Sequence, residues 1–249
     1  MAERKVVSNE SLVPALRSIG IIGGMGQWAT LDILERLLQA SVSFPIPQYG
    51  NRGYPEINVK MLNKAPMLLN TDGSYPETLT PSPELLAAAK YIGEQSDLLI
   101  VTSHTAHLFA DEIERAAGKP LVNMIAVTVD EVKSWGIKNV GVLAIGLTVD
   151  KKLFQSPLET LGINCFVLPK ELERRLEDEG VYPVQEGDAP GAHSAIAIEA
   201  VENLRQQGAE AVILGCTEIP LLLGAEAKAD YIINPSELIA QKVIRRAVE

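Results

Sequence analysis

Two short polar turns carry the residues of this chain best suited to acid–base or nucleophilic chemistry. Cys216 lies between Gly215 and Thr217, directly after the apolar run 211–214. At the end of a buried strand, backbone amides and hydroxyls are expected to lower the pKa of a thiol from about 8.5. We therefore predict that Cys216 is a general acid or base, against the commoner use of a lone cysteine as a small buried apolar side chain.

The turn that follows another apolar run, 98–101, carries a serine in the equivalent place. Ser103 lies 113 residues before Cys216, and the apolar runs that precede them are separated by the same interval. A serine hydroxyl is a much poorer base than a thiol unless a neighbour accepts its proton, and the adjacent His104 is a candidate acceptor. We predict that Ser103 and Cys216 face each other across a cleft.

A glycine-rich turn at 23–26 ends one apolar run and opens an amphipathic stretch. Free backbone amides and the helix dipole favour an anion at such a turn. The spacing is not that of a dinucleotide-binding fingerprint, and no Lys-Ser or Lys-Thr pair follows it as in a phosphate-binding loop. The two interpretations left open are a carboxylate-binding turn and a tight turn without a ligand.

Strands and helices must position these turns. The chain alternates short apolar runs with amphipathic stretches, as in an α/β protein with a parallel sheet, and ligands of such sheets bind at the carboxyl ends of the strands. The second half repeats the plan of the first, which indicates a duplicated unit. We expect strands near 18–22, 57–62, 98–101, 140–143 and 211–214, and helices near 30–40, 84–95, 107–117, 151–161 and 195–207.

The predicted architecture is a pair of similar parallel-sheet α/β halves with the active site in the cleft between them. The leucines at 31, 34, 37 and 38 are expected to share one buried helix face. The proline-rich loops beside the site are candidate lids. The expected domains are 18–120 plus 230–249 for the first and 121–229 for the second, preceded by a flexible tail at 1–17.

Composition and charge exclude several classes of protein. The 249 residues, 47% hydrophobic and 22% charged, are typical of a globular protein. With 22 basic and 32 acidic residues the net charge is −10, which argues against a nucleic-acid partner. No apolar run reaches the roughly 18 residues of a membrane span. The two isolated cysteines indicate neither disulfides nor a metal site, and we expect a cytoplasmic protein.

Other polar residues have structural interpretations. Cys165 lies in an apolar, strand-like run and is predicted to belong to the core. His107 is predicted to cap or pack a helix, and His193 to lie in a solvated loop. The charged run 170–179 is typical of an exposed helix face, with contact to a subunit or substrate as the alternative.

Three segments of the chain resemble the signature regions of the aspartate/glutamate racemase family. They are 19–30, 102–107 and 212–222, of which the last is the most specific. The resemblance implies two similar α/β halves with a small carboxylate substrate between them, no pyridoxal phosphate or other cofactor, no metal, and a homodimer. It also implies two cysteines that remove and return the α-proton from opposite faces.

The resemblance assigns the two catalytic positions to Cys216 and Ser103. The chain departs from the family pattern at the first of them, because Ser103-His104 stands where the family has Cys-Asn. It also has Gln27 in place of a common proline and Asn234 in place of a common aspartate. The positions expected to bind the substrate are Met25, Gly26, Arg52, His104, Thr105, Thr217 and Glu218.

These residues are compatible with three functions. The first is a cofactor-independent racemase that acts at the α-carbon of a small acidic amino acid, aspartate or glutamate. The second, favoured by Ser103, is a single-cysteine relative that works as a decarboxylase or as a cis-trans isomerase of a dicarboxylate. The third is an inactive homologue that binds a dicarboxylate or a partner protein.

Overall fold

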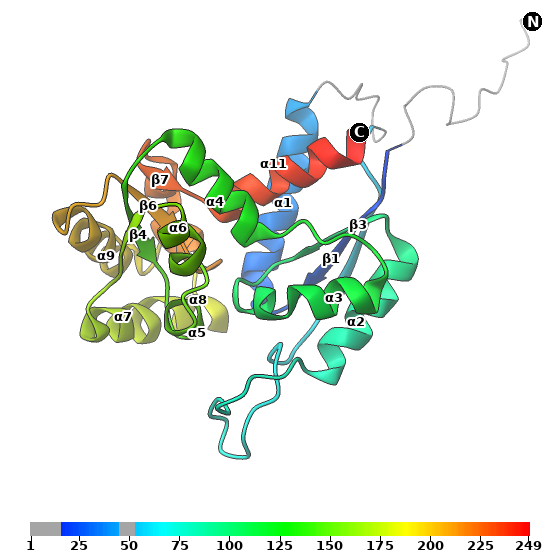
Figure 1. Ribbon diagram of the computed structural model, residues 1–249, viewed down its shortest axis with the longest axis horizontal. Coiled ribbons are helices and arrows are strands. Elements are labelled where there is room, and N and C mark those ends of the chain that lie inside the picture. The colour runs from blue at the N-terminus through cyan, green and yellow to red at the C-terminus, as the bar shows by residue number, and fades with distance from the viewer. Residues whose placement is uncertain (1–15, 45–52) are drawn as a thin grey trace, which may run out of the picture.

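The computed structural model describes residues 16–44 and 53–249, and Figure 1 shows their arrangement. Arg52 and most of the tail predicted at 1–17 lie outside these residues. The end of that segment is held in place, because the Arg17 amide donates to the Ala247 carbonyl at 2.9 Å. Within the described ranges, no helix is long and apolar enough to cross a membrane.

Within the described residues, seven strands form two parallel sheets, one in each half of the chain. The strand order is β2-β1-β3 in the first sheet and β5-β4-β6-β7 in the second, so each half places its first strand between its second and third. In the first sheet, Leu99 of β3 forms a parallel bridge with Leu121. This bridge takes the place that β7 takes beside β6 in the second sheet. These sheets confirm the predicted α/β fold with two similar halves. The strands are β1 (Ile19–Gly23), β2 (Ile57–Met61), β3 (Leu98–Val101), β4 (Asn139–Leu143), β5 (Asn164–Phe166), β6 (Ala211–Leu214) and β7 (Ile232–Ile233).

Helices cover both faces of each sheet. In the first half, Ile19 and Ile21 of β1 pack with α1 and α11, whereas Ile22 packs with α2 and α3. In the second half, α4 and α6 cover one face and α7, α9 and α10 the other. The helices are α1 (Gln27–Ser43), α2 (Pro83–Gln95), η2 (Thr105–Phe109), α3 (Ala110–Ala117), α4 (Met124–Trp135), α5 (Leu147–Asp150), α6 (Gln155–Thr160), α7 (Lys170–Leu176), η3 (Glu177–Val181), α8 (Tyr182–Glu186), α9 (Ser194–Gln206), α10 (Ile219–Leu223), η4 (Gly224–Lys228) and α11 (Pro235–Val248).

The C-terminal segment connects the two halves. Strand β7 pairs with β6 of the second sheet, and the Asn234 side chain then accepts from the Ser236 amide to cap α11. Helix α11 packs against α1, which belongs to the first half, and also contacts α4. In Figure 1, α4 and α11 run across the upper middle of the view between the two sheets.

The buried face of α1 differs from the predicted one. Leu37 is buried, but Leu31 and Leu38 are 51% and 43% exposed. The face turned to the core carries Ala29, Ile33 and Leu37, four residues apart. Leu34 packs against the same core, so the predicted face is wrong for Leu31 and Leu38 only.

Two predicted helices are interrupted. The stretch predicted at 107–117 starts as the 3-10 helix η2 and becomes α-helical only at Ala110. The stretch predicted at 151–161 is broken around Lys152, which has a positive φ of 52° between α5 and α6. The first irregular turn follows the end of β3 and begins with Thr105, which lines the cavity described below, whereas the second separates α5 from α6.

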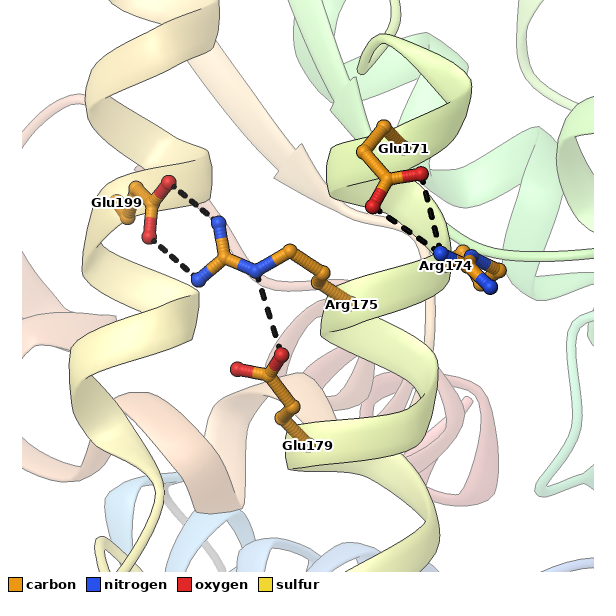
Figure 2. Close-up of polar contacts among 5 residues, drawn as sticks. All are labelled: Glu171, Arg174, Arg175, Glu179 and Glu199. Carbon is orange, nitrogen blue, oxygen red and sulfur yellow. Dashed lines mark hydrogen bonds and ion pairs between the residues drawn. The ribbon is translucent and has the colours of Figure 1, made fainter.

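The charged run 170–179 forms α7 and the π-helical turn η3, and its arginines are paired (Figure 2). Arg175 binds both oxygens of Glu199 on α9, at 2.9 and 3.2 Å, and contacts Glu179 at 3.3 Å. Arg174 donates to both oxygens of Glu171 at 3.1 Å. These side chains are exposed, as predicted, so each pair contributes at most about 1 kcal/mol.

One threonine ties the glycine turn to the end of β3. The Thr30 hydroxyl accepts from the Gly24 amide at 2.9 Å and donates to the Gly26 carbonyl at 2.8 Å. Because its single proton is used there, the Thr102 hydroxyl, 2.8 Å away, must be the donor in their contact. Gly24 has a φ of 84°, and a β-carbon there would collide with the Leu62 backbone. The turn is therefore fixed to β3 directly beside Ser103.

Replacing Thr30 by valine keeps the side-chain shape but leaves buried polar groups of the turn without partners. We expect Thr30→Val to lower the free energy of unfolding by about 1–3 kcal/mol in urea denaturation. Thr160→Val is the control, because Thr160 is exposed and should change that free energy by less than about 0.5 kcal/mol. Equal losses in the two variants would contradict the role given to the turn.

Candidate active site

The carboxyl ends of the two sheets open into one cavity of about 200 Å³. Ser103 and Cys216 both line it, from the ends of β3 and β6. Five of the seven residues expected to bind substrate also line it, and Gly26 lies at its edge against Glu218. The lining residues used below are Met25, Tyr75, Ser103, His104, Thr105, Gly146, Glu177, Tyr182, Gln185, Cys216, Thr217 and Glu218.

Cys216 is hydrogen-bonded to a carboxyl group two residues further along the chain. Its Sγ donates to Glu218 Oε2 at 3.2 Å, and the Thr217 hydroxyl donates to the same oxygen at 3.1 Å. Burial, followed by the charge of Glu218, raises the pKa of the Cys216 thiol well above its usual value. The expectation that the strand end lowers this pKa is wrong, because the thiol is itself buried and also lies beside an acidic neighbour. The thiol needs an acceptor for its proton before it can act as a base, and Glu218 is in place for that role.

Glu218 is 2% exposed and lies where the two halves meet. Burial raises the pKa of its carboxyl group, although the hydrogen bonds from Cys216, Gln185 and Thr217 oppose that shift. Its Oε1 atom lies against Gly26 and near Gln185, without a hydrogen bond of normal geometry. Sequence reasoning placed Glu218 among the substrate-binding residues, whereas its contacts here are with the thiol.

Ser103 has a different environment from Cys216. Its hydroxyl is 3.1 Å from the Thr105 hydroxyl, and the described contacts include no bond from it to His104. Both hydroxyls line the cavity. The equivalent positions of the two halves thus carry a thiol beside a carboxyl group and a hydroxyl beside another hydroxyl.

His104 is a buried, neutral imidazole. It is 3% exposed, and its ring packs edge-on against Phe154 with centroids 5.2 Å apart. Burial, then the neighbouring His107, lowers its pKa to about 3, and the Gly215 backbone opposes the shift. Neither ring nitrogen has a hydrogen-bond partner of normal geometry among the described residues. Such a weak base is poorly suited to take the proton of Ser103, which was the role considered from sequence.

His107 has a structural role, as one of its interpretations predicted. Its Nδ1 is 2.8 Å from the Ser103 carbonyl, and the Met124 amide donates to its Nε2 at 3.1 Å. Since Nε2 accepts, the proton must be on Nδ1, which donates to Ser103. Burial lowers the pKa of this imidazole to about 4. His107 therefore joins the Ser103 turn to the first turn of α4.

The cavity residues that were not singled out from sequence include Glu177, Tyr182 and Tyr75. Glu177 begins the π-helical turn η3, and the Tyr182 hydroxyl donates to its Oε1 at 2.9 Å. Burial, then Glu177, raises the pKa of Tyr75, and the same causes raise that of Tyr182 to about 12. Both phenols stay protonated at neutral pH. The only sequence signal was the charged run 170–179, whose regular helical pattern hid the irregular turn.

The charge of the cavity differs from the predicted anion cage. Glu177 and Glu218 line it, while among residues 16–44 and 53–249 no lysine or arginine does. Arg52, the predicted ionic clamp, lies outside these ranges. The described residues hold no group of three histidine, cysteine, aspartate or glutamate side chains placed to bind a metal ion. Hydroxyls and backbone amides are thus the donors that the described walls offer to a carboxylate.

The chain is similar to several known proteins, racemases among them. A 136-residue region, 53% of the chain, is 31% identical to an uncharacterized protein of Pectobacterium carotovorum subsp. carotovorum and covers 89% of it. Over 226 residues the chain is 20% identical to a broad-specificity amino-acid racemase of Bacillus subtilis, covering 91% of the chain and 96% of that protein. The solved structure of Picrophilus torridus aspartate racemase has the same fold, with a TM-score of 0.76, 22% identity, and coverage of 92% of this chain and 94% of that one.

A family match covers most of the chain. The family described as Asp/Glu/Hydantoin racemase matches residues 22–243, a range that includes both sheets and the cavity residues from Met25 to Glu218. The match confirms the resemblance seen in the three signature segments. The chain therefore belongs to the Asp/Glu/Hydantoin racemase family.

Proposed function

We propose that this protein is a cofactor-independent amino-acid racemase in which Cys216 exchanges the proton on the substrate α-carbon. The observation that carries the proposal is the hydrogen bond from the Cys216 thiol to Glu218, in a cavity that Ser103 lines from the other half. Family membership supports the same reaction class. The aspartate or glutamate substrate implied by the resemblance remains a prediction.

The first step generates a base at Cys216. The thiol passes its proton along the existing hydrogen bond to Glu218 Oε2, and the thiolate sulfur then takes the proton from the α-carbon. The electron pair of the broken C–H bond stays on the carbon and spreads into the substrate carboxylate. Because that carbanion is unstable in water, donors must hold the carboxylate and the cavity must exclude solvent.

The described walls offer such donors. The hydroxyls of Thr105 and Thr217 line the cavity, and the turn at Met25 and Gly26 presents backbone amides at the start of α1. The amides carry the positive end of the helix dipole, which favours a carboxylate. These residues bind the substrate α-carboxylate in the proposed reaction, as the family resemblance implies.

The second proton transfer falls to Ser103. Its hydroxyl delivers a proton to the opposite face of the carbanion. The serine then regains a proton from solvent through the Thr105 hydroxyl, 3.1 Å away, and Glu218 releases to solvent the proton that it took from Cys216. A hydroxyl is a far weaker acid than a thiol, so this step limits inversion. Exchange on the Cys216 face is thus faster than racemisation in the wild-type protein.

A second candidate is a single-cysteine decarboxylase or cis-trans isomerase. The observation that favours it is the asymmetry of the site, in which only Cys216 has an acid–base partner. In that reaction Cys216 alone delivers a proton to carbon or adds to a double bond. The variants below separate the two candidates.

Removing the thiol tests the central assignment. We expect Cys216→Ala to reduce α-proton exchange, measured by NMR in D₂O, by about 10²–10⁴-fold, the usual contribution of a general acid–base group. Cys165→Ala is the matched control, because Cys165 is a partly buried thiol outside the cavity. An unchanged exchange rate in Cys216→Ala would exclude this thiol as the working base.

The pH dependence of alkylation tests the role of Glu218. In a Cys165→Ala background, we expect iodoacetamide to modify Cys216 only at alkaline pH, because burial and the charge of Glu218 raise the thiol pKa. Glu218→Gln removes that negative charge, so the thiol pKa falls and the alkylation midpoint moves to lower pH. A midpoint that stays unchanged, or rises, would contradict the coupling of the two groups.

A second thiol tests the role of Ser103. Ser103→Cys supplies a better acid and base on the opposite face, so the ratio of racemisation to α-proton exchange should rise for at least one amino acid of a panel that includes aspartate and glutamate. Polarimetry gives the first rate and deuterium uptake the second. If no amino acid gains, while the wild type converts a dicarboxylate through Cys216, the single-cysteine reading replaces the racemase.

A further inference from the structure

We infer that the mouth of the cavity binds the positively charged end of a substrate side chain, with Glu177 as its counter-ion and Tyr75 and Tyr182 beside it. The inference rests on the proposed racemase function and names its substrate class: amino acids with a cationic side chain, such as lysine, ornithine or arginine. It therefore departs from the acidic substrate that the resemblance implies.

The side chains divide the cavity into a floor and a mouth. His104 and Glu218 are 3% and 2% exposed, whereas Tyr182 and Tyr75 are 45% and 55% exposed. The reacting thiol lies with the buried group, hydrogen-bonded to Glu218. A substrate whose α-carbon reaches Cys216 therefore extends its side chain toward the two tyrosines. Glu177 lines the same cavity as both tyrosines and Cys216, and the Tyr182 hydroxyl donates to its Oε1 at 2.9 Å, which places this carboxylate beside the mouth.

Glu177 lacks a cationic partner within the described part of the chain. Its hydrogen bond there comes from the neutral Tyr182 hydroxyl, and no lysine or arginine forms an ion pair with it. In contrast, Glu179 of the same turn contacts Arg175, as Figure 2 shows. A partly buried carboxylate without a counter-ion favours a bound cation, and tyrosine rings add cation–π attraction to an ammonium or guanidinium group.

A second carboxylate makes an acidic side chain unfavourable. Glu177 and Glu218 both line the cavity, so an aspartate or glutamate side chain would bring a third negative group between them. Like charges in one small cavity repel each other, and the described walls carry no cationic side chain to offset that repulsion. A cationic side chain instead neutralises one of the two carboxylates.

An independent observation indicates that the cavity is built for a polar ligand. The His104 ring lines it, is buried, and has no hydrogen-bond partner of normal geometry for either nitrogen among the described residues. A neutral imidazole offers one donor and one acceptor. The Gly215 backbone acts on this ring without a hydrogen bond of normal geometry, and such poor pairing in a buried place is costly. The substrate amino and carboxylate groups can satisfy them at the floor, which leaves Glu177 for the side chain.

The two halves share the mouth. Tyr75 belongs to the long loop between β2 and α2, which hangs at the bottom of Figure 1, whereas Glu177 and Tyr182 come from the second half. Backbone hydrogen bonds from Leu68 to Thr80 and from Asn70 to Ser74 make this loop hairpin-like. The cavity of about 200 Å³ is smaller than the sites of about 300–1,000 Å³ that hold drug-sized ligands, and it suits a single amino acid.

Substrate comparison tests the inference. Wild-type protein is assayed for α-proton exchange with L-lysine, L-ornithine, L-norleucine, L-glutamate and L-aspartate, where norleucine matches the lysine chain without its charge. We expect kcat/KM for lysine or ornithine to exceed that for norleucine and for glutamate by about 10-fold or more, the value of a hydrogen bond to a charged group. Higher kcat/KM for glutamate or aspartate than for every basic amino acid would overturn the inference.

Glu177→Gln and Glu179→Gln separate the local charge from the overall charge. Both remove one negative charge from the same turn, but only Glu177 lines the cavity. We expect Glu177→Gln to lower kcat/KM for lysine by about 10- to 100-fold, mainly through KM, while norleucine is little affected. Glu179→Gln should leave both substrates within about twofold, because its carboxylate is exposed. Equal effects of the two variants on lysine would overturn the inference.

Binding separates this inference from the proposed function. In calorimetric titrations of Cys216→Ala, lysine should bind more tightly than glutamate, and Glu177→Gln in the same background should remove the difference. If basic amino acids bind this way but none exchanges its α-proton in the wild type, the racemase proposal fails and the cation site stands. If amino acids exchange through Cys216 but glutamate binds as tightly as lysine, the cation site fails and the racemase proposal stands.

Discussion

Burial of the Glu218 carboxyl group between the two halves is the constraint on which the site depends. A carboxyl group that is 2% exposed needs donors, and Cys216 and Thr217 supply them from the same turn. The opposite wall must approach closely, and it does so at Gly26, where a β-carbon would collide with Glu218 Oε1. The Thr30 hydroxyl in turn holds the glycine turn that makes this approach. The position of the first half and the protonation of the thiol are thus set by one buried group.

The duplicated fold was predictable because it depends on local hydrophobic patterns. The runs 98–101 and 211–214 are continuous and apolar, as strands covered on both faces must be, and both are fully buried as β3 and β6. Helix faces were less predictable. Leu31 and Leu38 are exposed because the core side of α1 carries Ala29, Ile33 and Leu37, and which side of a helix meets the core depends on the neighbouring elements. The domain division at residues 120 and 230 stays a prediction.

The site was predictable where it follows strand ends and unpredictable where it depends on burial. Ser103 and Cys216 each follow the carboxyl end of a parallel strand, the edge at which such sheets bind ligands. The carboxyl edges of the two sheets meet at one cavity, which both residues line. The expected pKa of Cys216 is wrong in direction, since a strand end alone favours a thiolate whereas burial of the thiol, and then the neighbouring Glu218 carboxylate, oppose it. His104 was misjudged for the same reason, because burial removes the basicity that its residue type suggests. Glu177 escaped notice because a π-helical turn, which a regular helical pattern does not show, directs it into the cavity.

The two halves differ in the groups that surround Cys216 and Ser103, because each turn buries different side chains. The second half buries a carboxyl group beside its thiol, which raises the thiol pKa but also provides an acceptor within 3.2 Å. The first half buries a neutral imidazole and pairs Ser103 with another hydroxyl, so it contributes neither charge nor a strong base. Negative charge is therefore concentrated on the second-half wall, at Glu218 and Glu177, while the first half supplies hydroxyls and backbone amides. In the complex that we propose, the substrate places its carboxylate toward the first-half turn and its cationic side chain toward the second half.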